Sequence, residues 1–145
     1  MDIGRGLKQH IVRYALRKGH SRVVVGAIQN GYLEPSEWDY AIRCAEVGTI
    51  EEILRTGVGI SDYACEAAIH SNRPDVLRLL LEYGATIPDH ACEAAIVQGS
   101  PYMLLILLQR GAPLSGFETE YATEYTHSHP NTHNMMRVLK LYGFQ

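Results

Sequence analysis

Two segments of this chain are nearly identical, and they are offset by one repeat. Asp62-Tyr-Ala-Cys-Glu-Ala-Ala-Ile69 returns as Asp89-His-Ala-Cys-Glu-Ala-Ala-Ile96, so every matched residue number rises by the same 27. A period of roughly 20–50 residues is the signature of repeat proteins, whose units bury their apolar faces only by stacking on neighbours. The chain is therefore predicted to form a stack of units, a shape that presents an extended surface rather than a closed active site.

A second regularity marks the end of each unit. A Gly or Asn precedes a Gly at one constant spacing, with a mostly apolar stretch between, in the runs Gly19 to Gly31, Asn72 to Gly84, Gly99 to Gly111 and Asn131 to Gly143. Glycine at such a place takes the positive φ that commonly ends a helix. In the remaining unit the two glycines, Gly48 and Gly57, are closer together than this. The second helix of that unit is therefore predicted to be about one turn shorter.

Each unit is predicted to contain two helices. In the third unit Cys65, Ala68 and Ile69 fall at i, i+3 and i+4, the spacing of one helix face, within a helix from about Ser61 to Ser71. Pro74 suits the first turn of a second helix that ends at Gly84. In the second unit the corresponding face is assigned to Ala41, Cys44 and Ala45. No segment alternates as a strand, so we expect one all-α domain over 1–145, with units at approximately 3–34, 35–60, 61–87, 88–115 and 116–145.

The second half of the units resembles the ankyrin repeat. That family's pattern ends in paired Val, a Leu triplet and Gly-Ala, and Asn72-Arg-Pro-Asp-Val-Leu-Arg-Leu-Leu-Leu-Glu-Tyr-Gly-Ala85 follows it, as Leu16-Arg-Lys-Gly-His-Ser-Arg-Val-Val-Val25 does in part. The family's Thr-Pro-Leu-His opening is absent, and the period is 27 rather than about 33 residues. The resemblance implies an ankyrin-like helix-turn-helix solenoid of about five helix pairs, with shortened or absent β-hairpin fingers.

Charge is distributed unevenly, although the net charge is only −3. Residues 1–22 hold six of the 13 basic side chains and a single acid, Asp2. A basic end is compatible with nucleic acid or an anionic membrane. A charged outer face on the terminal repeat, which keeps a solenoid soluble, is the simpler interpretation.

No secretory signal is visible, and the longest strictly apolar run, Met103 to Leu108, is far below the roughly 18 residues that span a membrane. We therefore expect an intracellular protein, cytoplasmic or nuclear, without a membrane partner and with nucleic acid disfavoured.

The cysteines Cys44, Cys65 and Cys92 lack the paired spacing of a zinc site. Cys65 and Cys92 hold the same place in successive units, and all three thiols are expected to be small and buried, in a reducing compartment. Buried thiols are poor nucleophiles. The chain also has no phosphate-binding Gly-rich loop, no G-x-S-x-G and no H-E-x-x-H. We predict no catalytic residue, no enzyme activity and no cofactor.

The first helices carry polar side chains on the side away from their apolar residues. In ankyrin-like proteins the first helices line a concave surface on which partners dock. An aromatic and acidic surface suits another protein with Lys or Arg beside apolar anchors, while ordinary solvation of acidic residues is the alternative. Oligomeric state is left open. The predicted partner-binding residues are Trp38, Asp39, Asp62, Tyr63, Glu66, His70, Asp89, His90 and Glu93.

A second polar cluster precedes the last apolar helix. Its members are Glu118, Glu120, Glu124, His127, His129 and His133. Imidazoles at such spacing are able to converge on a metal, but the neighbouring Pro130 and polar residues are typical of an irregular connector, and no metal site is assigned. An enzyme or a small-ligand or metal-binding protein that uses residues 118–133 is the alternative to a protein-binding module.

Overall fold

A computed structural model describes residues 3–31, 35–113 and 132–142 of the chain. Within these ranges every regular element is a helix and no strand occurs, so the prediction of an all-α chain is confirmed for the described residues. The helices are α1 (Ile3–Lys18), α2 (Ser21–Gln29), α3 (Pro35–Cys44), α4 (Val47–Arg55), α5 (Ala64–His70), α6 (Pro74–Glu82), α7 (Ala91–Val97), α8 (Pro101–Gln109) and α10 (Thr132–Leu141).

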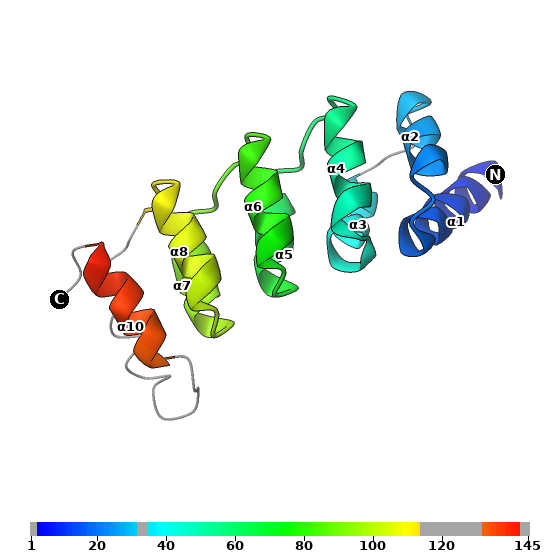
Figure 1. The fold of residues 1–145 in the computed structure, drawn as a ribbon. Coiled ribbons are helices and arrows are strands. Elements are labelled where there is room, and N and C mark those ends of the chain that lie inside the picture. The colour runs from blue at the N-terminus through cyan, green and yellow to red at the C-terminus, as the bar shows by residue number, and fades with distance from the viewer. Residues whose placement is uncertain (1–2, 32–34, 114–131, 143–145) are drawn as a thin grey trace.

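The helices form a row of hairpins that is two layers deep (Figure 1). In the first-helix layer α1, α3, α5 and α7 contact one another in that order. In the second-helix layer α2, α4, α6, α8 and α10 do the same. Each hairpin is therefore stabilised by the hairpins next to it in sequence. The hairpin of α1 and α2 lies at one end of the row and α10 at the other (Figure 1).

A tight turn joins the two helices within a hairpin, and backbone conformation explains its sequence. After α5, Asn72 takes a φ of 53°, and the amide of Arg73 donates to the carbonyl of Ala68 at 3.0 Å. After α7, Gly99 takes a φ of 71°, and Ser100 donates to Ala95 at 3.1 Å. This left-handed residue with its backward hydrogen bond is a standard helix ending, and it favours Gly or Asn.

The second helix of the second hairpin is not shortened, so that prediction was wrong. Helix α4 has nine residues, as do α2, α6 and α8. Gly48 lies inside α4 and does not precede it. The residue equivalent to Asn72 is Ala45. The spacing from Ala45 to Gly57 is the same as the spacing from Asn72 to Gly84. Unlike Asn72, Ala45 does not have a positive φ. Because this turn needs no left-handed residue, the sequence carries no Gly or Asn to mark it.

The apolar residues of both layers form one core along the row. Arg73 adds a polar contact between hairpins, since its Nη1 donates to the carbonyl of Ile42 at 2.7 Å. Stacking thus buries apolar faces that no single hairpin would cover. The largest fully buried side chains are Leu16, Ile42, Ile50, Ile53, Ile69, Leu77, Leu80, Ile96, Met103, Leu104, Leu107 and Leu139.

Three side chains of α3 lie on the opposite side from the one predicted. Ile42 was expected to face outward, at the place of Glu66, but it has no exposed surface. Trp38 was expected to face outward, but it is only 3% exposed, and its Nε1 donates to the carbonyl of Gly59 at 3.0 Å. It fills in α3 the place that Cys65 fills in α5, one repeat later. Cys44 was expected to be buried and is exposed, whereas burial of Cys65 and Cys92 is confirmed.

No helix in the described part of the chain is both long enough and apolar enough to cross a membrane.

Candidate functional site

The exposed side of the first-helix layer carries polar residues in register along the row. An offset of one repeat aligns Asp39 of α3, Glu66 of α5 and Glu93 of α7, and we call these three residues the acidic row. One helical turn later, the same offset aligns Arg43, His70 and Val97. Positions four apart in a helix lie on the same side, so each pair projects from the same surface of its helix.

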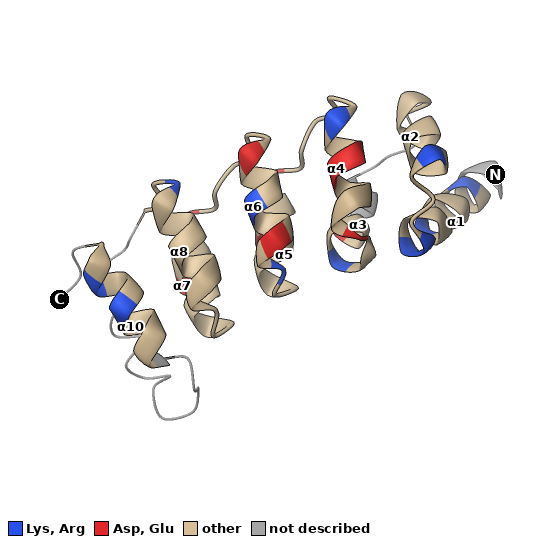
Figure 2. Cartoon of the chain, viewed as in Figure 1, with Lys and Arg blue, Asp and Glu red and all other residues tan. Residues whose placement is uncertain are grey.

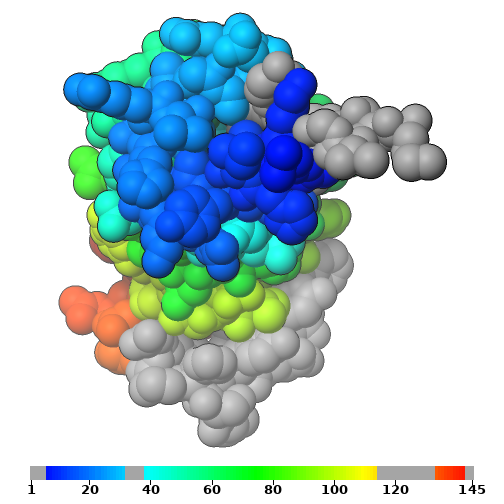
Figure 3. Space-filling view, turned by 90° about the vertical axis from the view of Figure 1, so that its right-hand side faces the viewer, coloured from blue at the N-terminus to red at the C-terminus, as the bar shows by residue number. Residues whose placement is uncertain are grey.

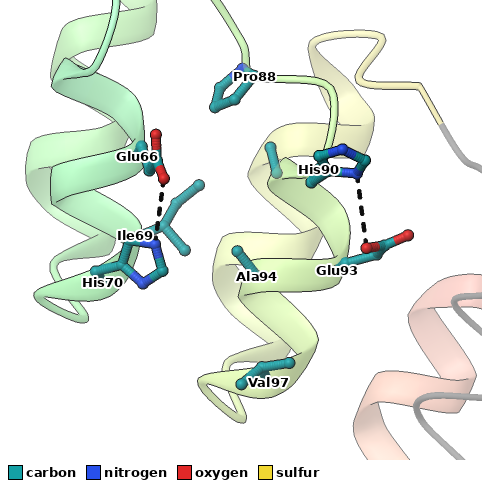
Figure 4. Close-up of a pocket in the computed structure, with 9 residues that line it drawn as sticks. Glu66, Ile69, His70, Pro88, His90, Glu93, Ala94 and Val97 are labelled. Atoms are coloured by element: carbon teal, nitrogen blue, oxygen red, sulfur yellow. Dashed lines mark ion pairs between the residues drawn. The ribbon is translucent and has the colours of Figure 1, made fainter.

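Each carboxylate of the acidic row lies close to an Arg or His side chain that is near it in sequence. Asp39 pairs with Arg43 on α3. The Glu66 carboxylate lies 3.6 Å from His70 Nε2 on α5, and the Glu93 carboxylate lies 3.7 Å from His90 Nδ1 (Figure 4). Exposed pairs of this kind contribute only about 0–1 kcal/mol to stability. The acidic row is therefore not there to hold the fold together.

A groove of about 350 Å³ separates α5 from α7. Ile69, Ala91 and Ala94 give it an apolar floor, and Figure 4 shows Ile69 between the two helices. Its rim is polar and charged. On the rim are Glu66, His70, His90 and Glu93, with Pro88 and Val97 completing the lining.

A second groove, also of about 350 Å³, lies between α3 and α5. Glu66 and His70 line it as well, so the two grooves adjoin along α5. Its other lining residues are Asp39, Arg43, Tyr63, Ala67 and Ser71. Together the grooves form a trough that crosses three first helices, with acids along its length.

The structure brings most of the predicted site residues to this trough or its edge. Tyr63 is 73% exposed, and Asp62 and Asp89 are exposed near the starts of α5 and α7. The expectation that the first helices present these residues outward is thus confirmed for every member except Trp38, which is in the core. The members that are outward are Asp39, Asp62, Tyr63, Glu66, His70, Asp89, His90 and Glu93.

Arg43, Pro88 and Val97 line the grooves but were not predicted as binding residues. Arg43 was missed because the second unit was aligned three residues out of register. A signal for the correct register is present in the sequence, because the pair Ala41-Ile42 recurs as Ala68-Ile69 and Ala95-Ile96. Aligning these buried pairs places Asp39, rather than Ile42, beside Glu66.

The buried Cys65 thiol and the arrangement of the described His, Cys, Asp and Glu side chains bear on nucleophilic and metal chemistry. Burial raises the pKa of the Cys65 thiol to about 11, so it is protonated and unreactive at neutral pH. No cluster of three or more His, Cys, Asp or Glu side chains able to hold a metal occurs in the part of the chain that the structure describes. His133 is exposed on α10. The other members of the predicted polar cluster, between residues 118 and 129, lie outside the described residues.

Charge varies along the row as well as across it (Figure 2). The coloured residues of α1 and α2 are all basic, whereas acids appear from α3 onward. Arg13 of α1 holds the position in the first hairpin that the acidic row holds in the others. It lies six residues before Gly19, the residue at the turn after α1, just as Asp39 lies six residues before Ala45, the residue at the turn after α3. The guanidinium of Arg13 lies over the ring of Tyr40, 5.4 Å from its centroid. The acidic row is therefore followed, at its α1 end, by a basic residue.

No family of known proteins matches the chain, and neither a curated protein nor a solved structure is detectably similar to it.

Proposed function

We propose that this chain is a non-catalytic protein-recognition module, an ankyrin-like solenoid that binds a partner protein across its first-helix layer. The observation that carries the proposal is the pair of adjoining grooves, each with charged residues on its rim. A surface that only solvated its acids would need no hollow between the helices. The segment recognised is one with apolar side chains for the grooves and Lys or Arg for the acidic row.

The size and chemistry of the α5/α7 groove support this partner class. A volume of about 350 Å³ is at the small end of the roughly 300–1,000 Å³ of small-molecule pockets. It suits one large apolar side chain entering over Ile69. Apolar anchors in pockets surrounded by polar residues are the usual arrangement of the residues that dominate protein interfaces.

The acidic row supplies the second part of the recognition. Asp39, Glu66 and Glu93 repeat at the helix spacing, about 8–10 Å for packed helices. At physiological salt this is close to the distance over which charges screen one another, so the row persists with little self-repulsion. Complementary charge mainly raises the rate at which partners associate. A basic segment running across the row would meet successive carboxylates.

Several features support an ankyrin-like solenoid in an intracellular setting. Hairpins of similar length stack in sequence order, and the second helices end at Gly57, Gly84 and Gly111 with positive φ. The described residues between hairpins contain no strand, as expected for shortened or absent fingers. None of the three cysteines forms a disulfide, which suits a reducing cytoplasm or nucleus.

Selection from a random peptide display library tests the proposal. On immobilised wild-type protein, we expect enrichment of peptides in which Lys or Arg flank a large aliphatic or aromatic residue. The variant Glu66→Lys with Glu93→Lys should lose these peptides. A control, Glu52→Lys with Glu82→Lys, makes the same change of charge on α4 and α6 and should retain them.

The kinetics of a selected peptide give a second test of the same claim. Association with the wild type should slow as salt is raised, because charge steers the encounter. The doubly substituted first-helix variant should show slow association at every salt concentration. Two results would show that the first-helix layer is not the binding surface. One is enrichment of acidic peptides on the wild type, and the other is selection of the same peptides by the first-helix variant and by the control variant.

A further inference from the structure

Helix α1 exposes an apolar stripe at the end of the row. Leu7, Ile11 and Tyr14 are 60%, 49% and 51% exposed, and they lie at i, i+4 and i+7, on one side of the helix. In Figure 3 this end of the row faces the viewer, and α1 and α2 lie in front of the other described helices. Large apolar side chains grouped at an end of the molecule indicate a contact surface.

The surroundings of the stripe are basic. Residues 3–33 contain no acid, and Lys8, Arg13, Arg17, Lys18 and Arg22 are exposed on α1 and at the start of α2. A symmetric pairing of two copies through α1 would bring these like charges together at close range. Like-charge contacts disfavour such an interface. The occupant of the stripe must therefore be acidic and must offer room for apolar side chains.

The first-helix layer of the same chain has both properties. The α5/α7 groove has an apolar floor. The α3/α5 groove is lined mostly by polar side chains, with Tyr63 and Ala67 as its apolar contributors. The acidic row of Asp39, Glu66 and Glu93 runs along the two grooves. The segment that the trough was inferred to recognise, basic with apolar anchors, describes α1. The chain thus carries two surfaces that are complementary to each other, the apolar stripe of α1 with its basic surroundings and the grooves along α3, α5 and α7.

The spacing of the anchors agrees with the spacing of the grooves. Leu7 and Tyr14 are seven residues apart, which is about 10 Å along a helix. The two grooves lie on either side of α5, so they are one helix spacing apart, about 8–10 Å. A helix lying across the first-helix layer would place one anchor in each groove.

We propose that α1 of one copy binds the first-helix layer of a second copy. Leu7 and Tyr14 occupy the two grooves, and the basic residues of α1 meet the acidic row. The two surfaces in this contact are different, so one copy of a bound pair keeps its first-helix grooves free and the other keeps its α1 free. Such contacts build open chains when the rotation between copies does not close a ring. This inference rests on the proposed function, because it assigns an occupant to the same grooves.

Two variants separate the surfaces. Leu7→Glu with Tyr14→Glu damages the α1 surface and leaves the grooves intact. Glu66→Lys with Glu93→Lys damages the acidic row and leaves α1 intact. In sedimentation velocity at low salt, wild-type protein should form larger species as its concentration rises and should dissociate when salt is added. Each variant alone should be a monomer of 16.2 kDa.

Mixing the two variants gives the decisive result. An equimolar mixture should form a one-to-one heterodimer that grows no further, because only one intact surface of each kind remains. Circular dichroism and thermal melting of each variant show that it is folded. The control Glu52→Lys with Glu82→Lys should self-associate as the wild type does.

Three outcomes would overturn the inference. They are a wild-type protein that stays monomeric at the highest concentration reached, a mixture of folded variants that stays monomeric, and a monomeric wild type that sediments with phosphatidylserine vesicles through α1. The last would assign the stripe to a lipid surface. Failure here is distinguishable from failure of the proposed function, because a monomeric protein that still binds selected basic peptides in its grooves retains that function.

Discussion

At the scale of single residues, burial determines which substitutions should lower stability most. Leu80 has no exposed surface and lies in α6, which contacts both α4 and α8. Truncating a buried Leu to Ala usually costs about 2–5 kcal/mol. Leu80→Ala should therefore lower the free energy of unfolding by that amount, measured by urea denaturation.

A matched control is available on the same helix. The side chain of Arg78 is 61% exposed, so Arg78→Ala should change stability by no more than about 0.5 kcal/mol. If Leu80→Ala lowered the melting midpoint by only a degree or so, Leu80 would not be interior and the register of α6 would be wrong.

The three thiols should differ in reactivity according to their burial. Cys44 is exposed and should react with a thiol reagent in the native protein, whereas Cys65 and Cys92 should react only on unfolding. Native protein should therefore titrate with one fast thiol, and Cys44→Ser should remove it. Rapid labelling of Cys65 and Cys92 in the native state would contradict the packing of α5 and α7. Dithiothreitol should leave stability unchanged, since no disulfide is formed.

Residue type predicted burial well where the repeat is nearly exact and poorly where it diverges. Cys65, Ala68 and Ile69 recur as Cys92, Ala95 and Ile96, and all six are buried as predicted. In α3 the same core place holds Trp38. The predicted alignment of this unit was three residues out of register, so Trp38 was interpreted as an exposed binding residue. Its burial follows from space in the core and a hydrogen bond to Gly59, neither of which a composition pattern displays.

At the scale of helices and turns, glycine has two opposite roles that a spacing rule does not distinguish. Gly84 follows α6 with a φ of +86°, and Gly48 lies inside α4. A Cβ added at either would meet nothing within 4 Å, so backbone conformation alone decides the effect of substitution.

Alanine at these two glycines should therefore change stability in opposite directions. Gly84→Ala should destabilise by about 1–2 kcal/mol, the cost of the left-handed conformation for a residue with a Cβ. Gly48→Ala should stabilise by roughly 0.5–1 kcal/mol, because alanine favours a helix more than glycine does. Both are measured by denaturant unfolding. A stabilised Gly84→Ala, or a destabilised Gly48→Ala, would mean that the boundaries of α4 and α6 are misplaced.

The sequence predicted that helix pairs exist, but it did not predict where every helix begins and ends. Apolar spacing and Pro74 placed α6 correctly, ending at Glu82 just before Gly84. Helix α5 begins at Ala64, later than the predicted Ser61, because Ser61 to Tyr63 form a turn in which Ala64 donates to the Ser61 carbonyl at 3.1 Å. Helix α4 was misjudged since Ala45 makes its turn without a left-handed residue. Turn conformations depend on local contacts that side-chain patterns record only in part.

At the scale of the whole molecule, stacking in sequence order determines which side chains become neighbours. The constant repeat period places Asp39, Glu66 and Glu93 in one row, and this was predictable once the units were aligned correctly. The grooves were not predictable. They depend on how α3, α5 and α7 sit against one another, with Pro88 and Val97 at the edges of one groove. The sequence therefore predicted the chemistry of the surface but not its shape.

The most direct test of the account is to locate a bound basic peptide by amide hydrogen exchange. The peptide is one selected on the wild-type protein, added at saturating concentration. The bound peptide should slow exchange in α3, α5 and α7, whose side chains line the two grooves, with little change in α4, α6 and α8. Protection confined to the second-helix layer, or absent from α5 and α7 while the peptide is bound, would contradict the claim that the first-helix layer is the recognition surface.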